Sequence, residues 1–490
     1  MKKYHFFSAL LAALLLLGLA APTAAAQPAG ESQPAQTGSS AQPADTSQPV
    51  QPEASGTPSV AFDAAVSISP PELTCGAAIL VDGDNDEVLY DHNAFQRMYP
   101  ASITKIMTSL VVLDAVSSGI ISLDTPVTAS QEAVDLPEGS STAGIQAGEV
   151  LSVEELLYCD LLPSGNDACN ILAETISGTT QAFADLMNAK AQALGMTNTH
   201  FANPHGLHDP QHYTTAYDIY LMAKEAMKHE TFRAIVSSAK HTLPATNMSD
   251  ERTIYSTNAL INNWLIQGYT YTKAIGIKTG STPEAGYCLA SAAVDMSGRT
   301  LYAVVLNAQV IRKEDGSTTR YQFKESRELL EWGFQNFERI SLLDESADLW
   351  EVPVTLSDEQ DHLVVQPKGS IERTMPTDYD PEKAELVTDL PESVEAPVEA
   401  GQKLGTVTLS YNGKTYGTLD LVTVSGAARS ESQYRAKVIR EYLEQWWVKA
   451  LIAAGAVLLF FLIILVTVII PRGRRRRGRG YRYSGRRRRY

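Results

Sequence analysis

The sequence predicts an α/β domain that carries a helical insertion, followed by a small β domain and a C-terminal membrane-spanning helix. Three observations predict this order. Strand-like runs at Ala77–Val81 and Leu301–Asn307 enclose a long stretch of helical pattern, which is typical of an α/β domain with an insertion. Short β-like runs alternate with Pro, Asp and Gly over residues 345–425. The uncharged, almost wholly apolar run 450–470 is long enough to cross a bilayer as a helix.

The N-terminus has the layout of a secretory signal peptide. Lys2 and Lys3 precede an apolar run, Phe6–Ala20, and small residues follow at Ala24–Ala26. We therefore expect residues 1–26 to be removed after Ala26. A retained anchor is the alternative, but the apolar run is short for a span. Residues 27–65, rich in Pro, Gln, Ala and Ser, cannot bury enough apolar surface to fold and are predicted to form a disordered linker.

Charge is divided sharply along the chain. The formal net charge is −16, yet residues 472–490 hold eleven arginines and no acidic residue. Residues 27–449 keep 27 basic against 56 acidic residues, a formal charge of −29. A segment with this much negative charge does not suit binding to nucleic acid. Positive residues beside a span stay in the cytoplasm, so the tail 471–490 is predicted to be cytoplasmic and the body extracytoplasmic. Contact of the tail with anionic lipid or, less favoured, with nucleic acid stays open.

The first domain is expected over residues 66–340. It opens with a hairpin, Ala77–Val81 and Glu87–Tyr90, turning at Asp82-Gly83. From Ser102 apolar residues recur at three- and four-residue spacing, which indicates a helix preceded by Pro100. The further helices and strands expected are Val153–Leu162, Asp167–Ile176, Thr180–Leu194, Ile275–Lys278, Tyr287–Val294, Leu301–Asn307 and a closing helix Arg327–Phe337.

The region 345–425 is expected to be a small β domain. Its clearest signal is Asn412-Gly413, a strong hairpin turn sequence between the runs Thr406–Tyr411 and Lys414–Val424. Strand-like runs also occur at Leu349–Val354, His362–Val365 and Leu386–Thr388. Residues 430–448 contain an amphipathic helix, Glu431–Gln445, that leads into the span with Trp446 and Trp447 at its boundary.

Three short motifs carry the chemistry. They are Ser102-Ile103-Thr104-Lys105, Ser164-Gly165-Asn166 and Lys278-Thr279-Gly280. Positions three apart on a helix share a face, so Ser102 and Lys105 are predicted to point into one site. A serine hydroxyl needs a neighbouring base, and a lysine amine becomes one when burial and a second cation lower its pKa. Lys278 is a candidate for that cation, and the small residues through Ser281 on an edge strand offer a donor for an oxyanion.

A second set of the same motifs competes with the first. Ser237-Ser238-Ala239-Lys240 and Ser256-Thr257-Asn258 repeat the spacing shortly before Lys278. Such spacings arise by chance about twice in a chain of this size. We consider this set weaker because Ser237 lacks the apolar helix that would bury the lysine. Its short separations also leave no room for a helical wall between motifs.

The three motifs, in order, resemble those of the low-molecular-mass penicillin-binding proteins, the serine-type D-alanyl-D-alanine carboxypeptidases. The resemblance lies in Tyr99–Thr108, Pro163–Ala168 and Gly276–Thr282, and extends to Phe201–Leu207 and Thr215–Asp218. It covers about residues 66–340, and the β domain resembles the C-terminal domain of that family. The resemblance implies a transpeptidase-like domain of the penicillin-binding-protein and β-lactamase type, an antiparallel sheet with helices and a helical insertion.

The resemblance also implies roles for individual residues. Ser102 attacks the carbonyl between two terminal D-alanines of a peptidoglycan stem peptide, and Lys105 takes its proton. Ser164, held by Asn166, relays a proton to the leaving amine. The substrate-binding residues that the resemblance implies are Asn166, Lys278, Thr279, Gly280 and Ser281. Among them Lys278 and Thr279 bind the terminal carboxylate, and the backbone amides of Ser102 and Ser281 bind the oxyanion. β-Lactam antibiotics acylate the same serine, and no metal or cofactor is used.

Other readings remain beside this one. A β-lactamase, an endopeptidase that cuts cross-links and a non-catalytic penicillin-binding scaffold share the motifs. Ser281 stands where many relatives carry an aromatic residue or histidine, and Arg320 is a further candidate for carboxylate binding. The spacing of His205, His208 and His212 suggests a metal, but no acidic or cysteine ligand matches, so local hydrogen bonding is favoured. Asp82–Asp86 is predicted to be an acidic turn rather than a calcium loop.

Overall fold

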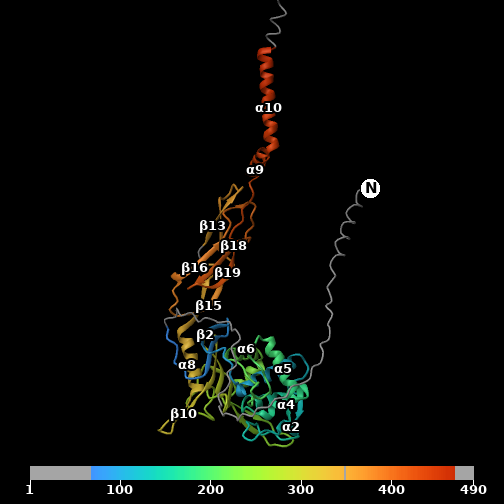
Figure 1. The fold of residues 1–490 in the computed structure, drawn as a ribbon, viewed down its shortest axis with the longest axis vertical. Coiled ribbons are helices and arrows are strands. Elements are labelled where there is room, and N and C mark those ends of the chain that lie inside the picture. The colour runs from blue at the N-terminus through green and yellow to red at the C-terminus, as the bar shows by residue number, and fades with distance from the viewer. Residues whose placement is uncertain (1–67, 347–348, 470–490) are drawn as a thin grey trace, which may run out of the picture. The chain divides into compact units, whose positions relative to one another are not determined.

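The computed structural model describes residues 68–346 and 349–469 (Figure 1). The predicted signal peptide at 1–26, the linker at 27–65 and the arginine-rich tail at 471–490 lie outside the described residues.

The centre of the first domain is a five-stranded antiparallel sheet of order β2-β1-β9-β8-β7. The predicted hairpin and the three later strands are confirmed. The hairpin pairs Leu80 with Tyr90, and β7 and β8 pair Lys278 with Ala290. The strands are β1 Ala77–Asp82, β2 Glu87–His92, β7 Ala274–Thr282, β8 Gly286–Val294 and β9 Thr300–Ala308. The third motif therefore lies on an edge strand of the sheet, as its sequence predicted.

Alternation along β1 separates two hydrophobic cores. Ala77, Ile79 and Val81 pack into one cluster, whereas Ala78 and Leu80 pack into another. Side chains of a strand point to opposite faces in turn, so each cluster covers one face of the sheet. The second cluster includes Phe323, Leu329 and Leu330 of the helix α8 (Tyr321–Asn336), which covers that face.

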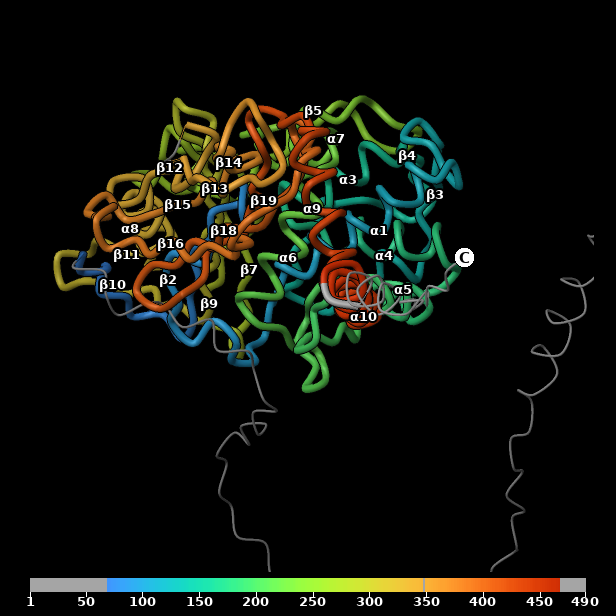
Figure 2. The backbone as a smooth tube through the Cα atoms, turned by 90° about the horizontal axis from the view of Figure 1, so that it is seen from above, coloured from blue at the N-terminus to red at the C-terminus, as the bar shows by residue number. Residues whose placement is uncertain are grey.

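The other face of the sheet is covered by the helical insertion. In Figure 2 the helices of this insertion lie on the side of β7 away from α8. Ser152, Thr179 and Thr215 cap three of the helices, each accepting a hydrogen bond from a backbone amide of the first turn. The helices are α1 Lys105–Ser117, α2 Gln131–Val134, α3 Val153–Leu161, α4 Asn166–Ser177, α5 Thr180–Ala193, α6 Ala216–Ala226 and α7 Glu230–Val236.

Three differences from the sequence-based expectation occur here. The helix expected from Ser102 opens with a 3₁₀ turn, Ala101–Thr104, before α1. The closing helix α8 starts six residues before the predicted Arg327, because Tyr321 and Phe323 already pack against the sheet. The short ladders β3 (Pro126–Thr128) with β4 (Val150–Ser152), β5 (Lys240–Leu243) with β6 (Arg252–Tyr255), and β10 (Val310–Arg312) with β11 (Thr318–Arg320) were not predicted.

The acidic turn after β1 is confirmed as a turn that contacts a helix. The Lys224 Nζ lies 2.5 Å from the Asp86 carboxylate, and the Tyr220 hydroxyl also donates to it. Both partners belong to α6. These two contacts join the turn after β1 to α6.

The later strands form a six-stranded sheet and a two-stranded ladder. The six-stranded sheet has the order β16-β18-β19-β14-β13-β17, and β12 pairs with β15. The predicted hairpin at Asn412-Gly413 is confirmed, since both residues have positive φ, 51° and 80°, as a tight turn requires. The strands are β12 Phe337–Leu343, β13 Trp350–Thr355, β14 His362–Pro367, β15 Ile371–Pro376, β16 Ala384–Asp389, β17 Val394–Glu395, β18 Lys403–Tyr411 and β19 Lys414–Thr423.

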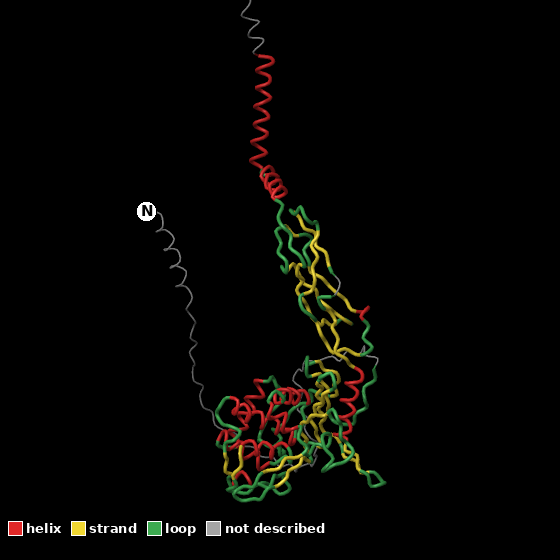
Figure 3. The backbone as a smooth tube through the Cα atoms, turned by 180° about the vertical axis from the view of Figure 1, so that it is seen from behind, coloured by secondary structure: helices red, strands yellow, loops and turns green. Residues whose placement is uncertain are grey.

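Two successive helices follow the β strands (Figure 3). The helix α9, Glu431–Glu444, is capped by Ser430, and α10 runs over Trp446–Ile464 before a π-helical turn, Leu465–Ile469. An 18-residue window within Trp446–Thr467 has a mean hydropathy of 2.9, and the segment is long and apolar enough to cross a membrane. The helix α10 starts at Trp446, four residues before the predicted start of the span at residue 450.

Candidate active site

The site forms where the edge strand β7 approaches the start of α1. A Cβ placed on Gly280 would lie 2.9 Å from the Pro100 carbonyl oxygen and from the Ser102 amide nitrogen. Any side chain at 280 would therefore push the strand away from the helix. The glycine of the third motif is thus required by the close approach of two backbones.

The first motif places its serine and lysine side by side. Because the 3₁₀ turn has three residues per turn, Ser102 and Lys105 lie one above the other. The Lys105 Nζ is 3.1 Å from the Ser102 Oγ, 2.7 Å from the Asn166 Oδ1 and 2.9 Å from the His205 carbonyl oxygen. Lys105 has no exposed surface. A neutral amine there can donate to the two carbonyl oxygens and keep its lone pair for the serine hydroxyl.

The second motif lies in the connection between α3 and α4. Asn166 is the first residue of α4, and its amide oxygen binds Lys105. Ser164 has a φ of 67°, a left-handed backbone that side chains disfavour. Its Oγ is buried and has no hydrogen-bond partner among the described residues. A polar atom left unpaired in a cleft is available to a substrate.

The third motif contributes a buried lysine. Lys278 is 1% exposed, and its Nζ donates to the Thr279 carbonyl oxygen at 3.1 Å. Burial, aided by the charge of Lys105, lowers the pKa of Lys278 to about 7. The Thr279 hydroxyl lies 2.6 Å from that of Thr257.

A cavity of about 170 Å³ joins the three motifs. Among the predicted site residues, the structure places Ser102, Ser164, Thr279, Gly280 and Ser281 in its lining. Lys105, Asn166 and Lys278 are buried beside it, and Arg320 also lines it. The lining residues that the sequence did not predict are Ser141, Thr257, Ile266, Tyr287, Cys288, Gln322 and Phe323. They come from segments without a motif, apart from Thr257.

The competing motifs are separated by the fold. The Ser237 hydroxyl donates to the Arg233 carbonyl oxygen, and Ser237 and Lys240 are exposed. The Lys240 ammonium lies 5.2 Å from the ring centre of Trp264. Of the second competing motif, only its middle residue, Thr257, lines the cavity. A catalytic pair at Ser237 and Lys240 is therefore not formed.

The predicted histidines contact protein groups. The Ala202 amide donates to the His212 Nδ1 at 3.1 Å, so the neutral ring carries its proton on Nε2, 2.8 Å from the Thr104 Oγ1. Burial lowers the pKa of His212 to about 4. Burial and the charge of Lys105 lower the pKa of His205 to about 3. Both rings are therefore neutral near pH 7.

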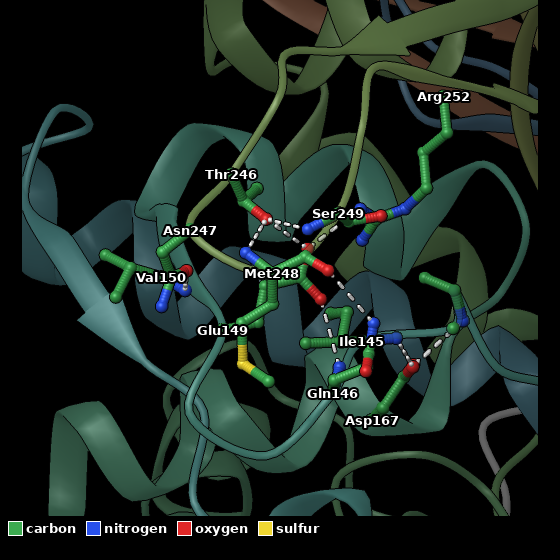
Figure 4. Close-up of polar contacts among 12 residues, drawn as sticks. Ile145, Gln146, Glu149, Val150, Asp167, Thr246, Asn247, Met248, Ser249 and Arg252 are labelled. Carbon is green, nitrogen blue, oxygen red and sulfur yellow. Dashed lines mark hydrogen bonds and ion pairs between the residues drawn. The ribbon is translucent and has the colours of Figure 1, made fainter.

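A network of carboxylate contacts lies next to the second motif (Figure 4). The buried carboxylate of Glu149 accepts from Arg252, Thr246 and the Gln146 amide at 2.8, 3.0 and 3.0 Å. Asp167, the residue after Asn166, accepts from the Ile145 amide at 3.1 Å. These bonds fasten the segment after Ser141 to α4 and to the strand β6.

Comparison with known proteins assigns the family. Residues 64–310 match the family described as D-alanyl-D-alanine carboxypeptidase, and residues 337–426 match the C-terminal domain of penicillin-binding protein 5. The D-alanyl-D-alanine carboxypeptidase DacF of Bacillus subtilis is 32% identical over 339 residues, which cover 69% of this chain and 82% of the relative. The chain belongs to the D-alanyl-D-alanine carboxypeptidase family.

Other members of this carboxypeptidase family are similar in sequence and in structure. The DacC protein of Escherichia coli is 32% identical over 74% of this chain and 87% of its own length. The crystal structures of penicillin binding protein 5 from Haemophilus influenzae have a TM-score of 0.56 at 29% identity, covering 74% of this chain and all of theirs. The carboxypeptidase DacD from Francisella tularensis has a TM-score of 0.58 at 26% identity, covering 74% of this chain and 97% of that one. The predicted fold class is therefore confirmed.

Proposed function

We propose that this chain removes the terminal D-alanine from peptidoglycan stem peptides that end in D-Ala-D-Ala, through an acyl-enzyme on Ser102. The observation that supports it most is the 3.1 Å approach of the Lys105 Nζ to the Ser102 Oγ at the cavity. Membership of the carboxypeptidase family supports the substrate. Trimming the fifth residue of the stem removes the donor for cross-linking, so the reaction limits cross-linking of the wall.

Acylation begins with transfer of the serine proton to Lys105. The Ser102 Oγ then bonds to the carbonyl carbon between the two D-alanines. The oxyanion that forms accepts hydrogen bonds from the backbone amides of Ser102 and Ser281. Lys278 and Thr279 bind the terminal carboxylate, with Gly280 letting the substrate backbone lie along β7.

Release of D-alanine needs a proton on its amine. Ser164, whose hydroxyl has no partner among the described residues, relays that proton, and Asn166 holds Lys105 beside it. The C–N bond breaks and free D-alanine leaves. Water then hydrolyses the ester, which regenerates Ser102. A β-lactam ring acylates the same hydroxyl.

We infer the cellular location from the composition of the two terminal segments. We assign residues 1–26 to a signal peptide, 27–65 to a linker, 66–340 to the catalytic domain and 345–425 to the β domain. The juxtamembrane helix at 430–448 and a single span at 450–470 would hold both domains on the extracytoplasmic face of the cell membrane. The tail 471–490 would remain in the cytoplasm.

The test uses purified protein with residues 60–425. It should release D-alanine from diacetyl-lysyl-D-alanyl-D-alanine and bind labelled penicillin covalently. Ser102→Ala should lower the rates of both reactions at least a thousandfold, whereas Ser237→Ala should leave both rates unchanged. Undiminished D-alanine release by the Ser102 variant would overturn the assignment.

Extending these assays to cross-linked dimers and to penicillin turnover separates the alternatives. An endopeptidase would cleave cross-linked dimers faster than pentapeptide, and a β-lactamase would hydrolyse penicillin with rapid turnover instead of remaining acylated. A non-catalytic scaffold would bind penicillin yet release no D-alanine.

A further inference from the structure

A compact loop, Leu260–Tyr271, lies in the irregular connection that joins β6 to β7. Its two ends meet, because the Tyr271 amide donates to the Leu260 carbonyl oxygen at 2.8 Å. Inside the loop the Thr270 hydroxyl donates to the Asn263 Oδ1 at 2.6 Å. Loops whose ends meet and whose own side chains pack them are compact surface units that are frequently functional. The 260–271 loop is therefore a defined element of the fold.

The 260–271 loop reaches the active-site cavity through Ile266. This side chain lines the cavity and also packs against the hydrophobic cluster that contains Phe323. Phe323 itself lines the same cavity. The two preceding side chains, Trp264 and Leu265, face the solvent instead, with 61% and 57% of their surface exposed. Ile266 and Phe323 thus form an apolar part of the cavity wall.

Tyr269 fastens the loop to the residues that follow it in this wall. Its hydroxyl accepts from the Arg320 amide at 2.8 Å and donates to the Thr318 carbonyl oxygen at 3.3 Å. The centres of the Tyr269 and Phe323 rings are 5.5 Å apart. Since Arg320 and Phe323 both line the cavity, these contacts fix the position of the loop relative to the rest of the lining.

The loop lies on the side of the cavity where the substrate chain is expected to stop. In the proposed reaction Lys278 and Thr279 bind the terminal carboxylate. The Thr279 hydroxyl is 2.6 Å from the hydroxyl of Thr257, which precedes the loop and also lines the cavity. Arg320, whose amide binds Tyr269, brings a further positive charge to the lining. The groups that attract a carboxylate therefore surround the loop.

We infer that Ile266 is a specificity-determining residue, and that the 260–271 loop closes the cavity beyond the terminal carboxylate, so that free D-Ala-D-Ala ends enter and cross-linked stems do not. This inference rests on the proposed function and selects the carboxypeptidase over the endopeptidase within it. In a cross-link, the carbonyl that Ser102 would attack carries a side-chain amine of a second stem peptide in place of D-alanine. That leaving group continues past the carboxylate position and would meet the wall, whereas a free terminus ends before it.

The test compares two substrates on the full chain, purified in detergent. One is a stem pentapeptide that ends in D-Ala-D-Ala, and the other is a cross-linked dimer whose stems have no D-Ala-D-Ala end. Specificity is the ratio of kcat/KM for cleavage of the dimer to kcat/KM for release of D-alanine. Ile266→Ala opens the wall and should raise this ratio by about tenfold or more. Leu265→Ala, the exposed neighbour in the same loop, should leave the ratio unchanged.

A second variant opens the wall without altering its lining. Tyr269→Phe keeps the ring beside Phe323 but removes the hydrogen bonds to Arg320 and Thr318. The loop is then free to move away, so the ratio should again rise, by several-fold. The rate of acylation by labelled penicillin, measured in parallel, reports that the cleft is folded. A purely structural loop would give a lower urea midpoint in both variants and the same ratio as Leu265→Ala, which would overturn the inference.

Failure of this inference differs from failure of the proposed function. If the unmodified chain releases D-alanine through Ser102 but Ile266→Ala leaves the ratio unchanged, only the role of the loop is overturned. Faster cleavage of the dimer than of the pentapeptide by the unmodified chain would also overturn it. If Ser102→Ala still releases D-alanine, the proposed function fails, and the role of the loop fails with it.

Discussion

Single residues of the cleft hold backbone conformations that no sequence motif reveals. Ala101, directly before Ser102, has a φ of 48°, and Ser164 has a φ of 67°. A side chain in this region costs about 1–3 kcal/mol. Surrounding contacts must hold these residues in place, and both lie in the segments that carry the first two motifs. Two of the positive-φ residues in the described part of the chain therefore lie in these motif segments.

His212 makes stability depend on pH at the scale of one residue. Its pKa is lowered to about 4 in the folded chain, against about 6.5 when unfolded. Between these values the unfolded chain binds one proton more, so the free energy of unfolding falls as the pH falls, by up to about 3 kcal/mol. His212→Gln, which can still accept from Ala202 and donate to Thr104, should flatten that slope in urea unfolding between pH 7 and 4.

An exposed histidine provides the matched control for that slope. His362→Gln, on β14, should leave the pH dependence of unfolding unchanged. Equal slopes in the His212 variant and the unmodified chain would contradict a neutral buried ring.

At the scale of elements, the site depends on how closely β7 approaches the 3₁₀ turn. In Gly280→Ala the new Cβ would meet backbone atoms of Pro100, Ser102 and Ile103 at 2.9–3.0 Å, and backbone atoms cannot rotate away. The strand must move, so acylation by labelled penicillin should fall at least a hundredfold. Overpacking should also lower stability by about 1–3 kcal/mol.

Gly333 on α8 is the matched control. A Cβ there would meet the ends of the Leu80 and Leu301 side chains at 2.6 and 2.8 Å, on the far face of the same sheet. Gly333→Ala should therefore lower stability while the acylation rate of the folded protein stays within a few-fold. An unchanged acylation rate in Gly280→Ala would contradict the prediction, because it would show that the site tolerates displacement of β7.

The elements also show how far sequence reasoning reaches. The segments β1, α3 and α5 were predicted within a residue or two. β1 is a continuous apolar run that ends at Asp82-Gly83, and the two helices carry apolar residues at helical spacing. Three- and four-residue strands such as β3 and β5 were not predicted, since so few residues show no period. The three motifs located the cavity, but Ser141 and Ile266 reach it only through loops that tertiary contacts position.

At the scale of the whole molecule, we predict that α10 rather than α9 attaches the chain to the membrane. The amphipathic α9 exposes Tyr434, Val438, Ile439 and Tyr442, an apolar face suited to an interface, whereas α10 is apolar all round. The full chain, expressed in a bacterium, should therefore remain in the membrane pellet in high salt and in alkaline carbonate, and only detergent should release it. A chain that ends at residue 444 keeps α9 and should leave the pellet in high salt, because an interfacial helix binds reversibly. A chain that ends at residue 429 should be soluble throughout and should still release D-alanine. Retention of the 444 chain in carbonate would show that α9 suffices as an anchor and would contradict the single span.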